Sequence, residues 1–191
     1  QLIEDDDIEA VIQTLKSDFL TQGPKVSEFE KKICEYTGAK YCVAVANGTA
    51  ALHIAVAALE LPSGSEGITS PITFTASANS MAFCGVKPVF ADINRITYNI
   101  SPDSILDTIN SKTRLLTPVH FAGQPAEIEK IAEIAKTKNL RIIEDAAHAI
   151  GSLYRDGCKV GNCKYSDLTI FSFHPVKTIT TAEGGAVTTN D

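Results

Sequence analysis

The sequence predicts an α/β fold of three layers, a mostly parallel β-sheet with helices on both of its faces. Apolar runs of strand length alternate with helical runs, and several strand runs are apolar throughout, as in strands buried on both faces. A length of 191 residues fits one domain, and no repeat, low-complexity tract or linker divides the chain. We therefore expect one α/β domain over residues 1–191.

Two helices are expected before the first strand. The first, over residues 5–17, has apolar side chains at helical spacing and acidic residues in its first turn, where the helix dipole stabilises them. The second, over residues 24–38, begins with Pro24 and stops at Gly38, residue types that favour the start and the end of a helix. A short flexible link joins the two.

The remainder of the chain alternates regularly between the two types of element. Apolar runs bounded by turn residues predict strands over residues 41–46, around Ile68, and over 86–91, 115–119, 140–144, 168–172 and 185–189. Helices are predicted over residues 48–60, 74–84, from Ser101 onward, and 125–138. Such sheets bind ligands beyond the carboxyl ends of their strands, so the segments that follow the strands are the candidate site.

Composition excludes several classes of partner. The net charge is -6 and no run of Lys and Arg occurs, which argues against nucleic acids and anionic membranes as partners. No apolar run reaches about 18 residues, and the amino terminus is acidic, unlike a signal peptide. The five cysteines form no CxxC pair or metal-ligand cluster. We expect a cytoplasmic protein with reduced thiols and no metal.

The turn after the first strand is a candidate anion site. Gly48 and Thr49 open the next helix, and backbone amides at a helix start can receive a phosphate. The alternative is a glycine turn whose small residues pack a helix on the sheet. Neither GxGxxG nor GxxxxGK[ST] occurs, so no common nucleotide-binding loop is indicated.

Asp145 follows the apolar strand at 140–144 directly. A carboxylate at the end of a buried strand loses solvation, which raises its pKa unless a cation lies beside it. The alternative is an exposed loop residue that caps the next turn. A histidine such as His148, three residues on, is by itself more often a hydrogen-bonded structural imidazole than a catalyst, so this pair alone does not decide the chemistry.

Lys177 lies five residues beyond the strand that ends at Ser172, in a stretch with no other charged residue over 168–182. Surface lysine is the ordinary alternative. Among apolar and hydroxyl residues, however, desolvation can lower the pKa of the amine, as a lysine that forms a Schiff base requires.

Pyridoxal 5'-phosphate (PLP) is the aldehyde cofactor that uses such a lysine. It also needs a phosphate cradle, an acid against its ring nitrogen and an apolar face on its ring. The sequence offers all three: Gly48 and Thr49 with Ser172 for the phosphate, Asp145 for the nitrogen, and Phe74 for the ring.

Five motifs, in this order and spacing, resemble the PLP-dependent sugar aminotransferases of the DegT/DnrJ/StrS family, within the fold type I, aspartate aminotransferase-like superfamily. They are TQGPKVSEFE, NGTAAL, SPITFTASAN, EDAAHAIG and SFHPVKTITTAEGGAVTTND. The last block is most similar to the branch that aminates C4 of a UDP-linked 4-keto-6-deoxy-N-acetylhexosamine on the route to pseudaminic acid.

The resemblance implies a role for each candidate residue. Lys177 is the catalytic residue, which binds the cofactor covalently and moves a proton, and Asp145 pairs with the pyridinium nitrogen. The other cofactor-binding residues are Phe74 on the ring, His148 near its 3-hydroxyl side, and Gly48, Thr49 and Ser172 at the phosphate. No role is assigned to His174 or Glu183.

The implied reaction transfers an amine, with glutamate as the donor, to a nucleotide-linked 4-keto-6-deoxysugar. The resemblance also implies a homodimer, and it makes residues 1–191 a PLP-binding large domain without the carboxyl-terminal small domain. Three alternatives stay open: an inert PLP-binding or dimerisation fragment, a sugar enzyme of different regiochemistry, and a PLP-dependent sugar dehydratase. Relatives that dehydrate carry His at the position of the lysine, so Lys177 favours amine transfer.

Overall fold

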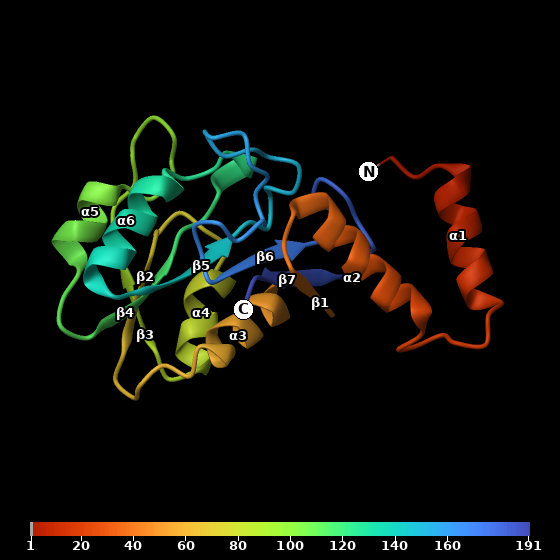
Figure 1. Cartoon of the computed structure of the whole chain (residues 1–191), viewed down its shortest axis with the longest axis horizontal. Coiled ribbons are helices and arrows are strands. Elements are labelled where there is room, and N and C mark those ends of the chain that lie inside the picture. Colours follow the sequence, from red (N-terminus) through yellow and green to blue (C-terminus); the bar gives the residue numbers. More distant parts are fainter. Residues whose placement is uncertain (1) are drawn as a thin grey trace.

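The computed structural model describes residues 2–191, and a mixed seven-stranded sheet runs through it (Figure 1). The strand order is β1-β7-β6-β5-β4-β2-β3. The strands are β1 (Tyr41–Val45), β2 (Glu66–Thr69), β3 (Lys87–Phe90), β4 (Thr113–Thr117), β5 (Arg141–Asp145), β6 (Leu168–Ser172) and β7 (Gly185–Thr189). Neighbouring strands from β3 to β6 are parallel, whereas β7 is antiparallel to both β6 and β1. The predicted mostly parallel sheet is confirmed.

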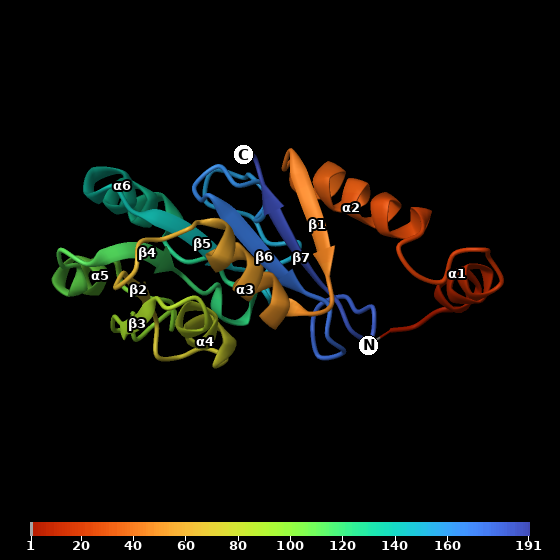
Figure 2. The ribbon, with the colours of Figure 1, turned by 90° about the horizontal axis from the view of Figure 1, so that it is seen from below.

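Helices lie on both faces of this sheet (Figure 2). They are α1 (Asp5–Leu15), α2 (Pro24–Thr37), α3 (Gly48–Ala58), α4 (Ala76–Phe83), α5 (Pro102–Thr108) and α6 (Ile128–Lys138), with a 3-10 turn, η1 (Phe121–Gly123). Local chemistry sets several of their ends. Gly38 takes the left-handed conformation that ends α2, and the Ser101 side chain accepts a hydrogen bond from Ser104 N at the start of α5.

Two apolar cores result, one on each face of the sheet, because successive strand side chains point to opposite faces. Ile142 belongs to the core that includes residues of α2, α5 and α6, and its neighbour Ile143 belongs to the core that includes residues of α3 and α4. The same alternation separates Phe171 from Ile170 in β6. Strands that bury both faces explain why their sequences are apolar throughout.

Several boundaries differ from the prediction. The helix expected over 125–138 begins only at Ile128, and the strand expected over 115–119 runs from Thr113 to Thr117. Pro118 follows that strand, and its carbonyl accepts a hydrogen bond from Asp145 N while its own nitrogen has no hydrogen to donate. The helix expected over 74–84 begins at Ala76.

Helix α1 stands apart from the sheet and its covering helices (Figure 1). It has the predicted helical spacing, but none of its residues is buried, and Ile8, Val11 and Leu15 are exposed. No helix within residues 2–191 is both long enough and apolar enough to span a bilayer. The five cysteines are free thiols.

We predict that Ile143→Ala lowers the free energy of unfolding by about 2–5 kcal/mol, because Ile143 is fully buried and its loss leaves a cavity. Val11→Ala, on exposed α1, should change it by less than about 0.5 kcal/mol. Urea unfolding followed by circular dichroism measures both. An equally small effect at the two positions would contradict the placement of Ile143 in the core.

Candidate functional site

A cavity of about 380 Å³ lies at the carboxyl ends of β5 and β6, where the sequence places the candidate site. Its lining includes all seven predicted site residues. They are Gly48 and Thr49 at the start of α3, Phe74 before α4, Asp145 at the end of β5, Ser172 at the end of β6, and His148 and Lys177 in the loops that follow those two strands. The fold thus brings together residues from four separate segments.

The start of α3 supplies backbone donors to this cavity. The Asn47 side chain accepts a hydrogen bond from Ala50 N at 2.9 Å and caps the helix. The first N–H groups of a helix have no acceptor within it, so those of Gly48 and Thr49 can receive an anion. A Cβ at position 48 would lie 2.8 Å from the Ser172 Cβ, so only glycine allows this approach.

The same helix also satisfies the packing alternative. Ala51 and Ala55 are fully buried against the sheet, and small side chains allow the helix to lie close to it. Close packing and an open helix start are compatible here, because Ala51 and Ala55 pack in the core while Gly48 and Thr49 line the cavity.

Asp145 is a buried carboxylate, with 4% of its surface exposed, so the alternative of an exposed loop residue is wrong. Its Oδ2 accepts a hydrogen bond from Ser77 Oγ at 2.6 Å, and its Oδ1 accepts one from Ala147 N at 3.2 Å. Both donors are neutral. A buried anion held by neutral donors at the wall of a cavity favours a positively charged ligand there.

Lys177 and His148 are in direct contact, with 2.7 Å between Lys177 Nζ and His148 Nε2. Burial lowers the pKa of the Lys177 amine, and the charge of Asp145 opposes this shift. Burial and the Lys177 charge lower the pKa of His148, again against Asp145. The neutral amine is the nucleophilic form, so the lowered pKa of Lys177 suits it to attack a carbonyl carbon.

Phe74 lies at the cavity wall with 73% of its surface exposed. Its ring is therefore free to cover a flat ligand. His174 and Glu183 also line the cavity, although no role was predicted for them.

Two residues that matter for Asp145 were not predicted. Ser77 is fully buried and donates to Asp145, and Thr73 Oγ1 lies 2.6 Å from Ser77 Oγ. Both belong to the hydroxyl-rich segment SPITFTASAN, which gave the signal that could have found them. The hydroxyl that donates to Asp145 is 68 residues away in the sequence, so the periodicity of the sequence could not identify it.

The cavity fits PLP in size and in chemistry. Its volume lies within the roughly 300–1,000 Å³ common for small-molecule sites. The helix start at Gly48 suits a phosphate, the buried Asp145 suits a protonated ring nitrogen, and the amine of Lys177 opens onto the same space.

Comparison with known proteins supports this assessment. The family model of the DegT/DnrJ/EryC1/StrS aminotransferases matches residues 1–191. The chain belongs to this aminotransferase family. The predicted resemblance is thereby confirmed, and solved structures of the family share the fold type I architecture described above.

Three relatives illustrate the membership. The chain is 42% identical over 190 residues to the spore coat polysaccharide biosynthesis protein SpsC of Bacillus subtilis and spans 48% of it. Helicobacter pylori PseC, an aminotransferase involved in the biosynthesis of pseudaminic acid, is 38% identical, with a TM-score of 0.95 over 100% of this chain and 51% of PseC. Spr1654 of Streptococcus pneumoniae, in its PLP form, is 33% identical with a TM-score of 0.93 and is covered to 52%. The chain thus spans about half the length of the relatives it matches.

We predict that Lys177→Met raises the pKa of His148, because the substitution removes the adjacent positive charge that lowers it. An NMR titration of the imidazole measures this pKa. Lys159→Met, which removes a lysine stacked on Tyr36 away from the cavity, serves as control and should leave the pKa unchanged. A fall, or no change, in the Lys177 variant would contradict the contact.

Proposed function

We propose that residues 1–191 form the PLP-binding large domain of a nucleotide-sugar aminotransferase. The observation that carries the proposal is the juxtaposition, in one cavity, of the Lys177 amine with a buried Asp145 carboxylate and the open start of α3. Membership of an aminotransferase family supports it. Because the chain spans about half the length of its relatives, we further propose that a small carboxyl-terminal domain completes the enzyme.

Each predicted site residue has a defined task in this proposal. When bound, PLP supplies a ring that accepts the electron pair of a deprotonated substrate carbon. Asp145 holds a positive charge at the ring nitrogen, and the N–H groups of Gly48 and Thr49, with Ser172, hold the phosphate. Phe74 covers the ring face.

Lys177 carries the catalytic step that belongs to the protein. Its amine would hold the cofactor and would supply the base that moves a proton between carbon atoms. His148 lies within hydrogen-bond distance of that amine and orients it. Its lowered pKa keeps the imidazole neutral near neutral pH, so its ring nitrogen can accept a hydrogen from the lysine.

The finer specificity is proposed from the relatives. We propose that glutamate donates the amine and that a UDP-linked 4-keto-6-deoxysugar accepts it at C4. The likeness to PseC and SpsC, which serve in pseudaminic acid and polysaccharide biosynthesis, supports a sugar substrate. The second candidate, an inert PLP-binding or dimerisation fragment, would bind the cofactor without transferring an amine. Different regiochemistry would leave the same cofactor site intact, whereas Lys177 argues against sugar dehydration, since the relatives that dehydrate carry His at that position.

We also propose that the enzyme is a cytoplasmic homodimer. Two features of the surface support a partner subunit: the apolar residues of α1 have no cover within residues 2–191, and Phe74 at the cavity wall is largely exposed. A second copy that covered both would shield the cavity from water.

Borohydride trapping tests the cofactor site. Protein incubated with PLP and reduced should carry the label on the peptide that contains Lys177, because borohydride fixes the cofactor to its lysine. Lys177→Ala should lose the label completely, whereas Lys159→Ala, outside the cavity, should keep it. Peptide mass mapping reads the position. Wild-type protein with no label, or with the label elsewhere, would refute the site.

An amine-transfer assay separates the enzyme from the inert fragment. Glutamate and UDP-linked or dTDP-linked 4-ketosugars are supplied to PLP-loaded protein, and release of 2-oxoglutarate with formation of aminosugar is measured. We expect equal amounts of both products, highest with the UDP sugar, and none from Lys177→Ala. Trapping at Lys177 without turnover would favour the inert fragment.

A further inference from the structure

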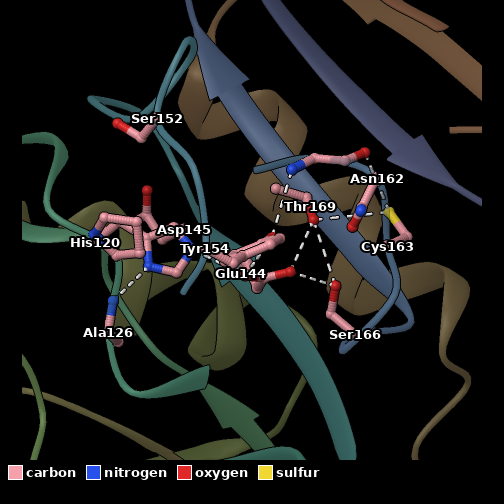
Figure 3. Close-up of polar contacts among 12 residues, drawn as sticks. His120, Ala126, Glu144, Asp145, Ser152, Tyr154, Asn162, Cys163, Ser166 and Thr169 are labelled. Atoms are coloured by element: carbon pink, nitrogen blue, oxygen red, sulfur yellow. Dashed lines mark hydrogen bonds and ion pairs between the residues drawn. The ribbon is translucent and has the colours of Figure 1, made fainter. Parts of the chain in front are cut away.

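Glu144, the residue before Asp145, is a fully buried carboxylate that the proposed chemistry does not use. Its Oε2 lies 2.8 Å from His120 Nε2 and accepts a hydrogen bond from Tyr154 Oη at 2.8 Å, and its Oε1 accepts hydrogen bonds from Ser166 and Thr169 (Figure 3). Burial alone would raise the pKa of Glu144, but these hydrogen bonds, that of His120 foremost, hold the pKa below its usual value. Glu144 is therefore ionised.

The orientation of His120 is fixed from both sides of its ring. Nδ1 accepts a hydrogen bond from Ala126 N at 3.0 Å, so Nε2 carries the hydrogen and donates it to Glu144. The side chain is almost fully buried and also lines the cavity. No other tautomer of a neutral imidazole satisfies both contacts.

His120 also holds the main chain of Asp145. The backbone N–H of His120 donates a hydrogen bond to the Asp145 carbonyl at 3.0 Å, and the backbone N–H of Asp145 donates one to the Pro118 carbonyl at 2.9 Å. Glu144 and Asp145 are thus both attached to the segment after β4, one by its side chain and the other by its backbone.

The two carboxylates are coupled by the geometry of a strand. Successive side chains point to opposite faces, so the direction of Glu144 determines the direction of Asp145. Four donors from three segments fix Glu144 on one face, which leaves Asp145 facing Ser77 and the cavity on the other.

We propose that Glu144 and His120 are positioning residues that hold the end of β5 with the Asp145 carboxylate directed into the cavity. The catalytic importance of this placement rests on the proposed function, because Asp145 is the residue proposed to hold the ring nitrogen. The placement itself needs no cofactor. The competing interpretation is that the cluster stabilises the core and nothing more.

Two variants separate these interpretations. Glu144→Gln keeps the shape of the side chain, but it replaces one acceptor oxygen with an NH2 donor that faces the hydroxyl and imidazole donors. His120→Gln removes the ring and leaves the Glu144 side chain in place, so the two variants break the contact from opposite sides. Ser166→Ala is the matched control, since it removes one donor to the other oxygen of Glu144.

Hydrogen exchange on the full 191-residue chain without cofactor is the first measurement. In both variants the amides of His120 and Asp145 should exchange on the order of tenfold faster relative to those of β2, because their hydrogen bonds open locally. In Ser166→Ala any acceleration should be uniform. The pKa of His148, measured by NMR, should fall in both variants and in Asp145→Asn, because Asp145 raises that pKa.

Unchanged exchange and an unchanged His148 pKa in folded Glu144→Gln and His120→Gln would overturn the proposal, as would equal changes in Ser166→Ala. If both variants fail to fold, wild-type exchange still decides. The His120 and Asp145 amides must then open only with global unfolding, and faster local exchange would overturn the proposal. All of these results are independent of whether PLP binds, which borohydride trapping at Lys177 reports separately.

Discussion

Burial of two adjacent negative charges at the end of β5 is the constraint on which the site depends. A carboxylate removed from water must be supplied with donors, or its burial costs several kcal/mol. Within residues 2–191 neither Glu144 nor Asp145 forms an ion pair with a lysine or arginine. Hydroxyls, an imidazole and a backbone amide supply the donors instead, and all but the amide of Ala147 come from segments distant in sequence.

This requirement connects the fold to the cavity. Side chains on one face of β5 meet α4 through Ser77, and those on the other meet the loops that carry Tyr154 and Ser166. The antiparallel strand β7 adds a further constraint at its first residue, Gly185. The backbone of Asn47 lies so close to Gly185 that a side chain at position 185 would clash with it. The start of α3 therefore lies against the last residue of β6 and the first residue of β7, where it faces Asp145 and Lys177 across the cavity.

Sequence patterns predicted the elements well, because their signals are local. Apolar runs located every strand, and Gly38 and Ser101 marked helix ends through backbone conformation and capping. The positions of Asp145 and Lys177 after apolar strands indicated a site, since strand ends of a parallel sheet converge. The partners of the carboxylates could not be predicted, because Ser77 meets Asp145 across 68 residues, and His120 meets Glu144 across 24. Such contacts depend on tertiary packing.

Asp145 also couples the ligand to the amine. Its charge raises the pKa of both Lys177 and His148, whereas burial lowers both. A cation bound against Asp145 cancels much of that charge, and the effect of burial on Lys177 then acts unopposed. Binding of a positively charged ring at Asp145 therefore lowers the pKa of the nearby amine further, toward the neutral form that reacts. In the proposed function, one buried carboxylate would thus serve both as an anchor for the ligand and as a control on the reactivity of the lysine.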